Sequence, residues 1–149
     1  MQPDSRSSRV YPMAPCPAVG AVVFRNDAVL LVRRGNSPSR GMWAIPGGSV
    51  GLGETLQAAA EREILEETGV VIRAREPVFV FDAIQRDAGG RIKYHYVIVD
   101  LAADYIRGEP RAGDDAADAR WVTAAELRNL NANPITRRLL AEQFNFGKV

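Results

Sequence analysis

Hydrophobic runs separated by polar turns divide most of the chain into short strands. The turn Arg25-Asn26-Asp27 separates the first two runs, which indicates two neighbouring strands. The sequence Asp87-Ala88-Gly89-Gly90 is typical of a hairpin turn between two later strands. In all, strands are predicted over residues 18–24, 28–34, 78–84, 94–101 and 119–122.

Three segments have the composition and flanking residues of helices. The longest is rich in Ala, Leu and Glu, which are strong helix formers, and it lies between a capping Thr55 and Gly69. The predicted helices run from Leu56 to Glu67, from Thr123 to Leu130 and from Pro134 to about Phe144. Because strands surround a central helix and further helices follow, we expect an α/β fold with a mixed sheet and helices on its faces.

Length and composition fit one compact domain. The chain has 149 residues, of which 46% are hydrophobic and 25% charged, the balance of an ordinary globular protein. Residues 1–17 are rich in Ser, Arg and Pro and are expected to form a flexible N-terminal segment. The folded domain is then expected over residues 18–149, without internal repeats or a second domain.

Charge and cysteine content exclude several classes of protein. The chain has 19 Lys and Arg residues against 18 Asp and Glu residues, so bulk charge does not hold it to nucleic acid. Its only cysteine, Cys16, cannot form an internal disulfide, which favours a reducing compartment. No apolar run is long enough to span a membrane, and the polar start lacks a signal core. We therefore expect a cytoplasmic protein without nucleic-acid or membrane partners.

Three glutamates on the central helix form the first candidate site. Residues three and four positions apart on a helix are neighbours, so Glu63 lies beside both Glu66 and Glu67. Like charges at these spacings are destabilising unless something offsets them, and a divalent cation is the natural offset. Carboxylates are hard oxygen ligands, which suit Mg²⁺ or Mn²⁺. Glycines between Gly47 and Gly53 let the preceding backbone bend tightly and approach a ligand.

A solvated acidic helix face is the alternative interpretation of these glutamates, because such faces are common. Two features favour the metal site. Leu56 and Ala59 share the angular stripe of Glu63, so this stripe is not purely a water-facing one. The glycine cluster also leads directly into the helix.

The segment from Gly48 to Val70 carries a longer pattern with fixed spacing. Its fixed positions are Gly48, Glu54, Arg62, Glu63, Ile64, Glu66, Glu67, Gly69 and Val70. This pattern resembles the complete Nudix box of the Nudix hydrolases, and Trp43 followed by Pro46-Gly47-Gly48 is also typical of that family. The resemblance covers nearly all of the chain after its first residues. It implies a Nudix-type α/β/α sandwich with a mixed sheet.

The resemblance also implies roles for individual residues. Glu63, Glu66 and Glu67, with the carbonyl of Gly48, are expected to bind a catalytic Mg²⁺ or Mn²⁺. Arg62 is expected to hold the orientation of the helix glutamates, and Glu54 to stabilise the junction of loop and helix. Family chemistry is attack by a metal-assisted water on a phosphorus atom of a diphosphate.

Several substrate classes stay open. The chain resembles small bacterial proteins grouped with ADP-ribose pyrophosphatases, which implies a nucleoside diphosphate linked to another moiety, such as ADP-ribose or a sugar nucleotide. The proline that marks classical ADP-ribose enzymes is absent, and Gln85 lies near its place. The alternatives are a (d)NTP pyrophosphohydrolase and a non-catalytic module that binds a nucleotide metabolite. The whole box argues against the module. Family members often dimerise, so a homodimer stays open.

Candidate substrate ligands lie close to the box. Arg33 and Arg34 end a predicted strand beside the site, and arginine suits phosphate geometry. The backbone of Gly47 and Gly48 is expected to approach the substrate. Trp43 is a further candidate, although such tryptophans more often anchor a core. Arg40 is a weaker candidate for a phosphate contact.

The acidic loop 108–118 offers a general base. Family members commonly take a further carboxylate from a loop downstream of the box, and the candidates here are Glu109, Asp114, Asp115 and Asp118. We favour Asp115 or Asp114, because this pair is central in the loop. His95, the only histidine, lies between Tyr94 and Tyr96, and a structural or base-stacking place is expected for it.

Overall fold

The computed structural model describes residues 9–36, 39–113 and 115–148. The strands are β1 (Cys16–Arg25), β2 (Ala28–Arg34), β3 (Trp43–Ala44), β4 (Gly47–Ser49), β5 (Val71–Arg86), β6 (Ile92–Arg107) and β7 (Ala116–Thr123). The helices are α1 (Leu56–Thr68), α2 (Ala124–Arg128) and α3 (Pro134–Phe144).

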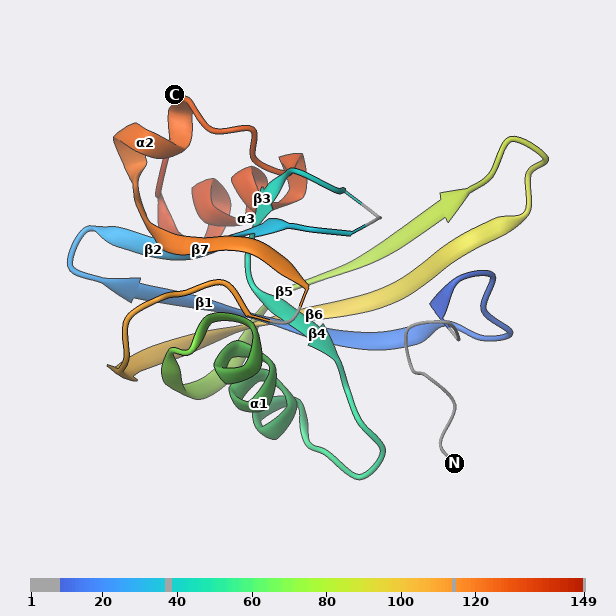
Figure 1. The fold of residues 1–149 in the computed structure, drawn as a ribbon, viewed down its shortest axis with the longest axis horizontal. Coiled ribbons are helices and arrows are strands. Elements are labelled where there is room, and N and C mark those ends of the chain that lie inside the picture. The colour runs from blue at the N-terminus through green and yellow to red at the C-terminus, as the bar shows by residue number, and fades with distance from the viewer. Residues whose placement is uncertain (1–8, 37–38, 114, 149) are drawn as a thin grey trace.

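The strands form a mixed sheet with helices on both faces, as predicted. The strand order is β3-β2-β1-β6-β5, with β4 paired to β1 and β7 paired to β2. β1 runs parallel to β6, and the other pairs are antiparallel. Figure 1 shows α1 on one side of the sheet and α2 and α3 on the other. The α/β/α sandwich is therefore confirmed.

The hydrophobic core is divided between the two faces of the sheet. Side chains alternate along a strand, so Val22 of β1 packs toward Leu139 of α3, while Val23 packs toward Ile64 of α1. Ala59 of α1 belongs to a further buried cluster on the α1 side. Helix α1 is therefore fixed by its apolar stripe, and its acidic residues are left along the edge. In the described ranges, no helix is long and apolar enough to cross a membrane.

The long hairpin of β5 and β6 extends further than the hydrophobic pattern predicts. Each strand has 16 residues, against the predicted ranges 78–84 and 94–101. The additional residues pair through their backbones while polar side chains such as Arg73 and Arg75 stay exposed. Bulges around Pro77 shift the register within the ladder. A hydrophobic pattern therefore finds only the part of each strand whose side chains are buried.

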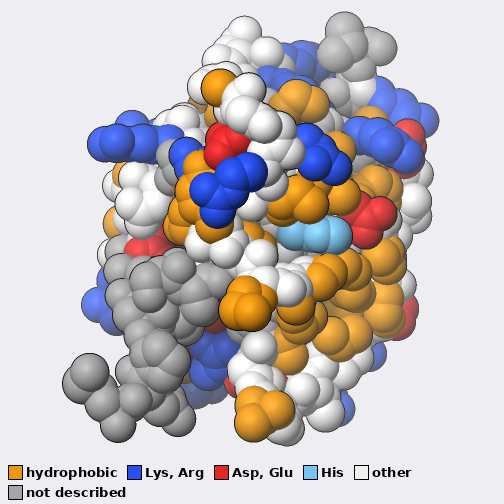
Figure 2. Space-filling model, turned by 90° about the vertical axis from the view of Figure 1, so that its right-hand side faces the viewer, with side chains coloured by type: hydrophobic (Ala, Val, Ile, Leu, Met, Phe, Trp, Pro, Cys, Tyr) orange, Lys and Arg blue, Asp and Glu red, His pale blue; other side chains and the backbone are white. Residues whose placement is uncertain are grey.

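The outer face of this hairpin carries exposed hydrophobic residues. Val80 and Ile84 are 60% and 52% exposed, and His95 lies opposite Ile84 in the ladder. Figure 2 shows hydrophobic side chains gathered beside the histidine. Tyr94 and Tyr96 lie on the opposite face with stacked rings, 6.4 Å between centroids, so the predicted alternation is confirmed.

Several other boundaries differ from the prediction, among them the end of α2, which lies at Arg128 instead of Leu130. β1 begins at Cys16, two residues earlier than expected, because Cys16 and Pro17 pair with β6. Gly47 and Gly48 lie in the short strand β4 instead of a loop. The acidic loop ends before Ala116, where β7 begins. The hairpin turn at Asp87–Gly90 is confirmed by the hydrogen bond from the Gly90 N–H to the Asp87 carbonyl.

Candidate active site

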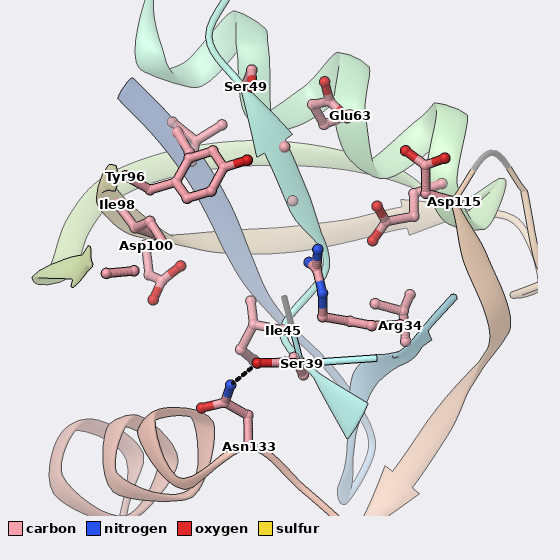
Figure 3. A pocket seen from close by; sticks show the side chains of 18 of the residues that line it. Arg34, Ser39, Ile45, Ser49, Glu63, Tyr96, Ile98, Asp100, Asp115 and Asn133 are labelled. Atoms are coloured by element: carbon pink, nitrogen blue, oxygen red, sulfur yellow. Dashed lines mark hydrogen bonds between the residues drawn. The ribbon is translucent and has the colours of Figure 1, made fainter. Parts of the chain in front are cut away.

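A cavity of about 400 Å³ lies between α1, the β5–β6 hairpin and the start of α3. Figure 3 shows its two ends, which differ in chemistry. The charged end is formed by Arg34, Arg62, Glu63, Glu66, Glu67 and Asp115. The apolar end is formed by Ile45, Phe81, Ile98, Asp100, Ile135 and Thr136.

Helix α1 delivers its glutamates to the charged end. The Thr55 hydroxyl accepts a hydrogen bond from the Ala58 N–H at 3.0 Å and caps the first turn. Gly69 ends the helix in the left-handed conformation, with a φ of 77°, as its position predicted. Because Ala60 and Ile64 are fully buried against the sheet, the glutamates lie at the edge of the helix beside β4.

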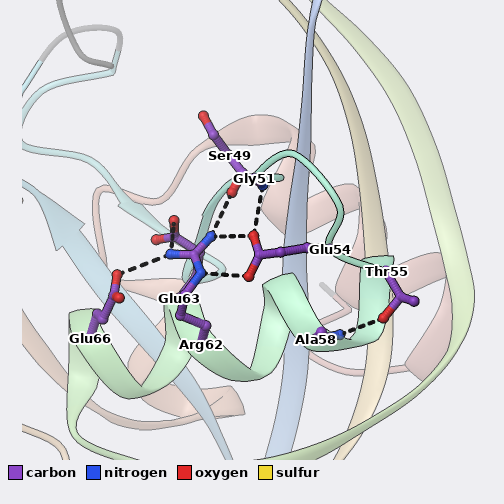
Figure 4. Close-up of polar contacts among 8 residues, drawn as sticks. All are labelled: Ser49, Gly51, Glu54, Thr55, Ala58, Arg62, Glu63 and Glu66. Carbon is purple, nitrogen blue, oxygen red and sulfur yellow. Dashed lines mark hydrogen bonds and ion pairs between the residues drawn. The ribbon is translucent and has the colours of Figure 1, made fainter. Parts of the chain in front are cut away.

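Arg62 organises the acidic residues of this helix (Figure 4). Its guanidinium donates two hydrogen bonds to the Glu54 carboxylate, at 2.7 and 2.8 Å. It also donates to Glu63 at 2.9 Å, to Glu66 at 3.1 Å and to the Ser49 carbonyl at 3.0 Å. The Arg62 pairing and the Gly51 N–H hold the pKa of Glu54 down at about 2. Arg62 therefore joins the glycine loop, the helix and two candidate ligands.

Glycine at position 48 lets Glu63 approach the backbone of β4. A Cβ at this position would lie 2.3 Å from the Cδ atom of Glu63, so any larger residue would displace the carboxylate. The Glu63 side chain is 14% exposed, and burial raises its pKa. Gly48 therefore permits a close contact between the β4 backbone and the Glu63 side chain.

Glu67 is the carboxyl group at the charged end whose ionised form is disfavoured most strongly by its surroundings. Burial raises its pKa to about 7, and the charges of Glu63 and Asp115 act in the same direction. Arg34 and a hydrogen bond from the Gly47 backbone oppose this rise. A cation at this end would relieve the repulsion between the carboxylates.

The donor set suits a hard divalent cation. Carboxylate oxygens, with the backbone of Gly48 beside Glu63, are the oxygen ligands that Mg²⁺ and Mn²⁺ accept. Among the described residues, no three His, Cys, Asp or Glu side chains surround one point closely enough to hold an ion as they stand. Glu63 and Glu66 each direct an oxygen to Arg62 instead.

Other predicted residues are only partly brought to the cavity. Arg34 lines it, as do Gly47 and Gly48. Arg33 is exposed on β2 and does not line it. The structure corrects the expectation for Trp43. It is 6% exposed within the core beside α3, and the guanidinium carbon of Arg120 lies over its ring, 4.5 Å from the centroid. Its large apolar side chain is therefore used for packing rather than exposed to a substrate.

Of the four acidic loop candidates, Asp115 reaches the charged end. Glu109 forms an ion pair with Arg25 at 2.7 Å and does not line the cavity. Asp118 lies within β7, and its carboxylate accepts a hydrogen bond from the backbone N–H of the next residue, Ala119. Asp114 lies outside the described residues.

Sequence reasoning missed the polar residues of the apolar end. Asp100 is 5% exposed on β6, and Thr136, also 5% exposed, lies in the first turn of α3. The Thr136 hydroxyl accepts a hydrogen bond from the Ile45 N–H at 3.4 Å. The available signal for Asp100 was a single acidic residue inside an otherwise hydrophobic run, Val97 to Leu101.

Known proteins resemble both the sequence and the fold. Residues 14–143 match the family model of the NUDIX domain. The ADP-ribose pyrophosphatase of Methanocaldococcus jannaschii is 36% identical over 127 residues, which cover 85% of this chain and 70% of that protein. A putative 8-oxo-dGTP diphosphatase 2 of Mycobacterium tuberculosis is 35% identical over 127 residues, covering 83% of this chain and 84% of the relative. The crystal structure of a MutT NUDIX hydrolase from Burkholderia pseudomallei has a TM-score of 0.74 and 32% identity, covering 88% of this chain and 98% of its own.

Proposed function

This chain belongs to the Nudix family and is a pyrophosphohydrolase, and we propose that it cleaves the diphosphate of a nucleoside diphosphate linked to another moiety, with Mg²⁺ or Mn²⁺. The observation that carries the proposal is the shape of the cavity. Its charged end gathers the carboxylates of α1 beside Gly48, and its apolar end offers space for the uncharged part of a nucleotide. ADP-ribose and sugar nucleotides have this division, as nucleoside triphosphates also do, and the name of one relative, ADP-ribose pyrophosphatase, favours the linked diphosphates.

The chain's own residues would prepare the diphosphate for attack. Glu63, Glu66, Glu67 and the Gly48 carbonyl would hold the divalent cation. When bound, that cation would neutralise phosphate charge and activate water as a nucleophile. Arg62 would keep Glu63 and Glu66 in place through its hydrogen bonds. Arg34, at the same end, would contact phosphate oxygens.

We assign the general base to Asp115. Removal of a proton from the attacking water needs a group within hydrogen-bond reach of it. Among the described acidic residues of the loop, Asp115 is the one that lines the charged end. Asn36 donates to its Oδ1 atom at 3.2 Å and thereby helps to orient the carboxylate.

A (d)NTP pyrophosphohydrolase is the second candidate function. It is favoured by the 35% identity to a protein named a putative 8-oxo-dGTP diphosphatase. The two candidates release different products, because a nucleoside triphosphate gives a monophosphate and pyrophosphate. A diphosphate linked to another moiety gives two monophosphates.

The test is a substrate panel analysed for products. ADP-ribose, ADP-glucose, UDP-glucose, ATP and dGTP are incubated separately with the protein and Mg²⁺. We expect the highest kcat/KM on a linked diphosphate, with two monophosphates formed in equal amounts. Highest kcat/KM on a triphosphate, with release of pyrophosphate, would replace this proposal by the second candidate. E67Q is the inactive control, and E142Q, which makes the same change at an exposed position of α3, is the matched control.

A further inference from the structure

The apolar end of the cavity contains a buried carboxyl group without a protein partner. Asp100 is 5% exposed, and its Oδ1 atom lies so close to Gly20 that a Cβ there would come within 2.2 Å of it. In the described part of the chain, its carboxyl makes no hydrogen bond or ion pair. Burial alone, unopposed by any charged neighbour, raises its pKa to about 7. Neither of its oxygens is among the described side-chain atoms that are enclosed without a partner, so the carboxyl opens to the cavity, where a bound ligand would supply its hydrogen bonds.

Asp100 faces the cavity from the middle of β6. Side chains alternate along a strand, so Tyr96, Ile98 and Asp100 share one face, and all three line the cavity. Figure 3 shows their side chains on one side of the cavity, with Ile45 and Asn133 across from them. The carboxyl therefore lies on the wall of a space that a ligand would enter.

The surroundings of Asp100 fit a flat heterocycle better than a sugar. Phe81 of β5 pairs with Ile98 of β6 in the ladder, and together they form one apolar wall. Ile45 lies across the cavity from them, and Ile135 is a further apolar lining residue. A ribose or hexose carries several hydroxyl groups that would each need a polar partner, whereas the nearby Thr136 hydroxyl and Asn133 amide already make hydrogen bonds within the protein. A base needs only hydrogen bonds at one edge, and its faces are satisfied by apolar contact.

We propose that the apolar end binds the adenine base of the substrate, with the Asp100 carboxyl pairing with the amino group and the adjacent ring nitrogen. This inference rests on the proposed function and specifies the heterocyclic base of its nucleotide substrate. A protonated carboxyl has one O–H donor and one carbonyl acceptor. Adenine presents the matching pair, an amino donor beside an acceptor nitrogen.

The number of polar groups on the base edge separates adenine from guanine. Along the edge used for base pairing, adenine has two polar groups, the amino group and the adjacent ring nitrogen. Guanine has three, and one carboxyl can pair with only two of them in either charge state, so the third would face the apolar wall unpaired. Cytosine also carries an amino group beside an acceptor nitrogen, but its smaller ring would cover less of Phe81 and Ile98.

The test compares substrates that differ only in the base. ADP-glucose, GDP-glucose, CDP-glucose and UDP-glucose are compared by kcat/KM for the wild-type protein, D100N and D100L. We expect the wild type to prefer ADP-glucose, and D100L to lower kcat/KM for ADP-glucose by about 10–100-fold, the range of a paired base edge. For UDP-glucose, D100L should change kcat/KM by less than about threefold. D100N should retain most of the preference, because an amide also pairs with adenine through one donor and one acceptor.

A matched control and a binding measurement complete the experiment. D82N changes an exposed aspartate on the neighbouring strand β5, facing away from the cavity, and should leave all four values unchanged. Calorimetry with AMP and GMP measures base recognition without hydrolysis. We expect tighter binding of AMP than of GMP, and loss of this difference in D100L. Leucine is apolar and has the same number and branching of side-chain heavy atoms as aspartate, so D100L should fold, and its thermal transition checks this.

The outcomes separate the two proposals. If none of the nucleotides is hydrolysed but AMP is preferred in an Asp100-dependent manner, the proposed function fails and the base assignment stands. If all four nucleotides are hydrolysed and D100L lowers each value equally, Asp100 has a structural role and the base assignment is wrong. Preference for the guanine compounds in hydrolysis or binding would also overturn it.

Discussion

The two ends of the cavity hold carboxyl groups in opposite ways. At the charged end, Glu63 and Glu66 share the guanidinium of Arg62, which also pairs with Glu54. At the apolar end, Asp100 lies among hydrophobic side chains, and burial raises its pKa to about 7. At the charged end, a hydrogen-bond network holds the carboxylates in place before substrate arrives. At the apolar end, the Asp100 carboxyl gains its hydrogen-bond partner only from a ligand that binds beside it.

This difference indicates a division of labour. Charged groups held by several hydrogen bonds are suited to stabilising charge that develops on a phosphate. An unpartnered carboxyl in an apolar wall is suited to selecting one ligand over another, because a mismatched ligand leaves it unsatisfied. Substitutions at the charged end should therefore lower turnover for all substrates, whereas D100L, which removes the pairing group, should change the order of substrates.

The largest effect is expected from Glu67→Gln. Removing one carboxylate from the proposed metal site weakens stabilisation of the transition state, so kcat should fall by ~10²–10³-fold on every substrate. Steady-state kinetics with E142Q as control measures this. The fold should be retained, since a like-charge contact is relieved. Wild-type turnover in both E66Q and E67Q would show that α1 is not the metal site.

A smaller loss of turnover is expected from Asp115→Asn. The amide cannot accept the proton of the attacking water, so kcat should fall by ~10²-fold while KM changes little. D118N and E109Q are matched controls from the same acidic segment, and both should retain near-normal kcat. If D115N also retains it, a glutamate of α1 must act as the base.

Arg62→Lys tests whether the network positions the glutamates. Lysine cannot reproduce the forked contacts to Glu54, so Glu63 and Glu66 should lose part of their orientation. We expect about a 10-fold lower kcat and a higher Mg²⁺ concentration for half-maximal activity. R73K, at an exposed position of β5, is the control. An unchanged Mg²⁺ requirement would mean that Arg62 only stabilises the fold.

The smallest effect is on the stability of the metal-free protein. Asp100 has an ordinary pKa of 3.8 and a folded pKa of about 7, so the folded state binds its proton more tightly. The contribution of Asp100 to the free energy of unfolding is therefore fully present below pH 3.8 and is lost as the pH rises through 7. Glu67 and Glu63 act in the same direction. In chelator, the melting temperature should therefore be lower at about pH 8 than at about pH 5.5.

The variant D100N isolates the contribution of Asp100, because its amide does not titrate. The drop in melting temperature between about pH 5.5 and about pH 8 should be a few degrees smaller in D100N than in the wild type. D82N should show the wild-type drop. An equal drop in D100N would mean that Asp100 already has a partner in solution.

The sequence predicted the charged end better than the apolar end, and the reason is physical. Helix α1 is defined by local signals, the cap at Thr55 and the αL glycine at Gly69, so its predicted range 56–67 differs by one residue from the observed Leu56–Thr68. Spacing within one helix also places Glu63 beside Glu66 and Glu67.

The apolar end depends on contacts between distant segments. Asp100 acquires its environment from β1 and from the chain before β4 and α3, and no local pattern carries that information. The same limit applies to Trp43, whose packing beside α3 is decided by tertiary structure. This limit also applies to the loop candidates. The sequence favoured Asp115 or Asp114 only by their central position, and the path of the chain shows that, of the described candidates, Asp115 faces the cavity.

The most direct measurement follows ADP-ribose hydrolysis by phosphorus NMR, with Mg²⁺ and with excess chelator. With Mg²⁺ we expect the diphosphate resonances to be replaced by those of AMP and ribose 5-phosphate in equal amounts. In chelator we expect no conversion, because the glutamates of α1 would then have no cation to present to the phosphates. Full conversion in chelator would contradict a metal-dependent site at the charged end. If ADP-ribose and the other linked diphosphates all stay intact in Mg²⁺ while triphosphates are cleaved, the assigned substrate class is wrong.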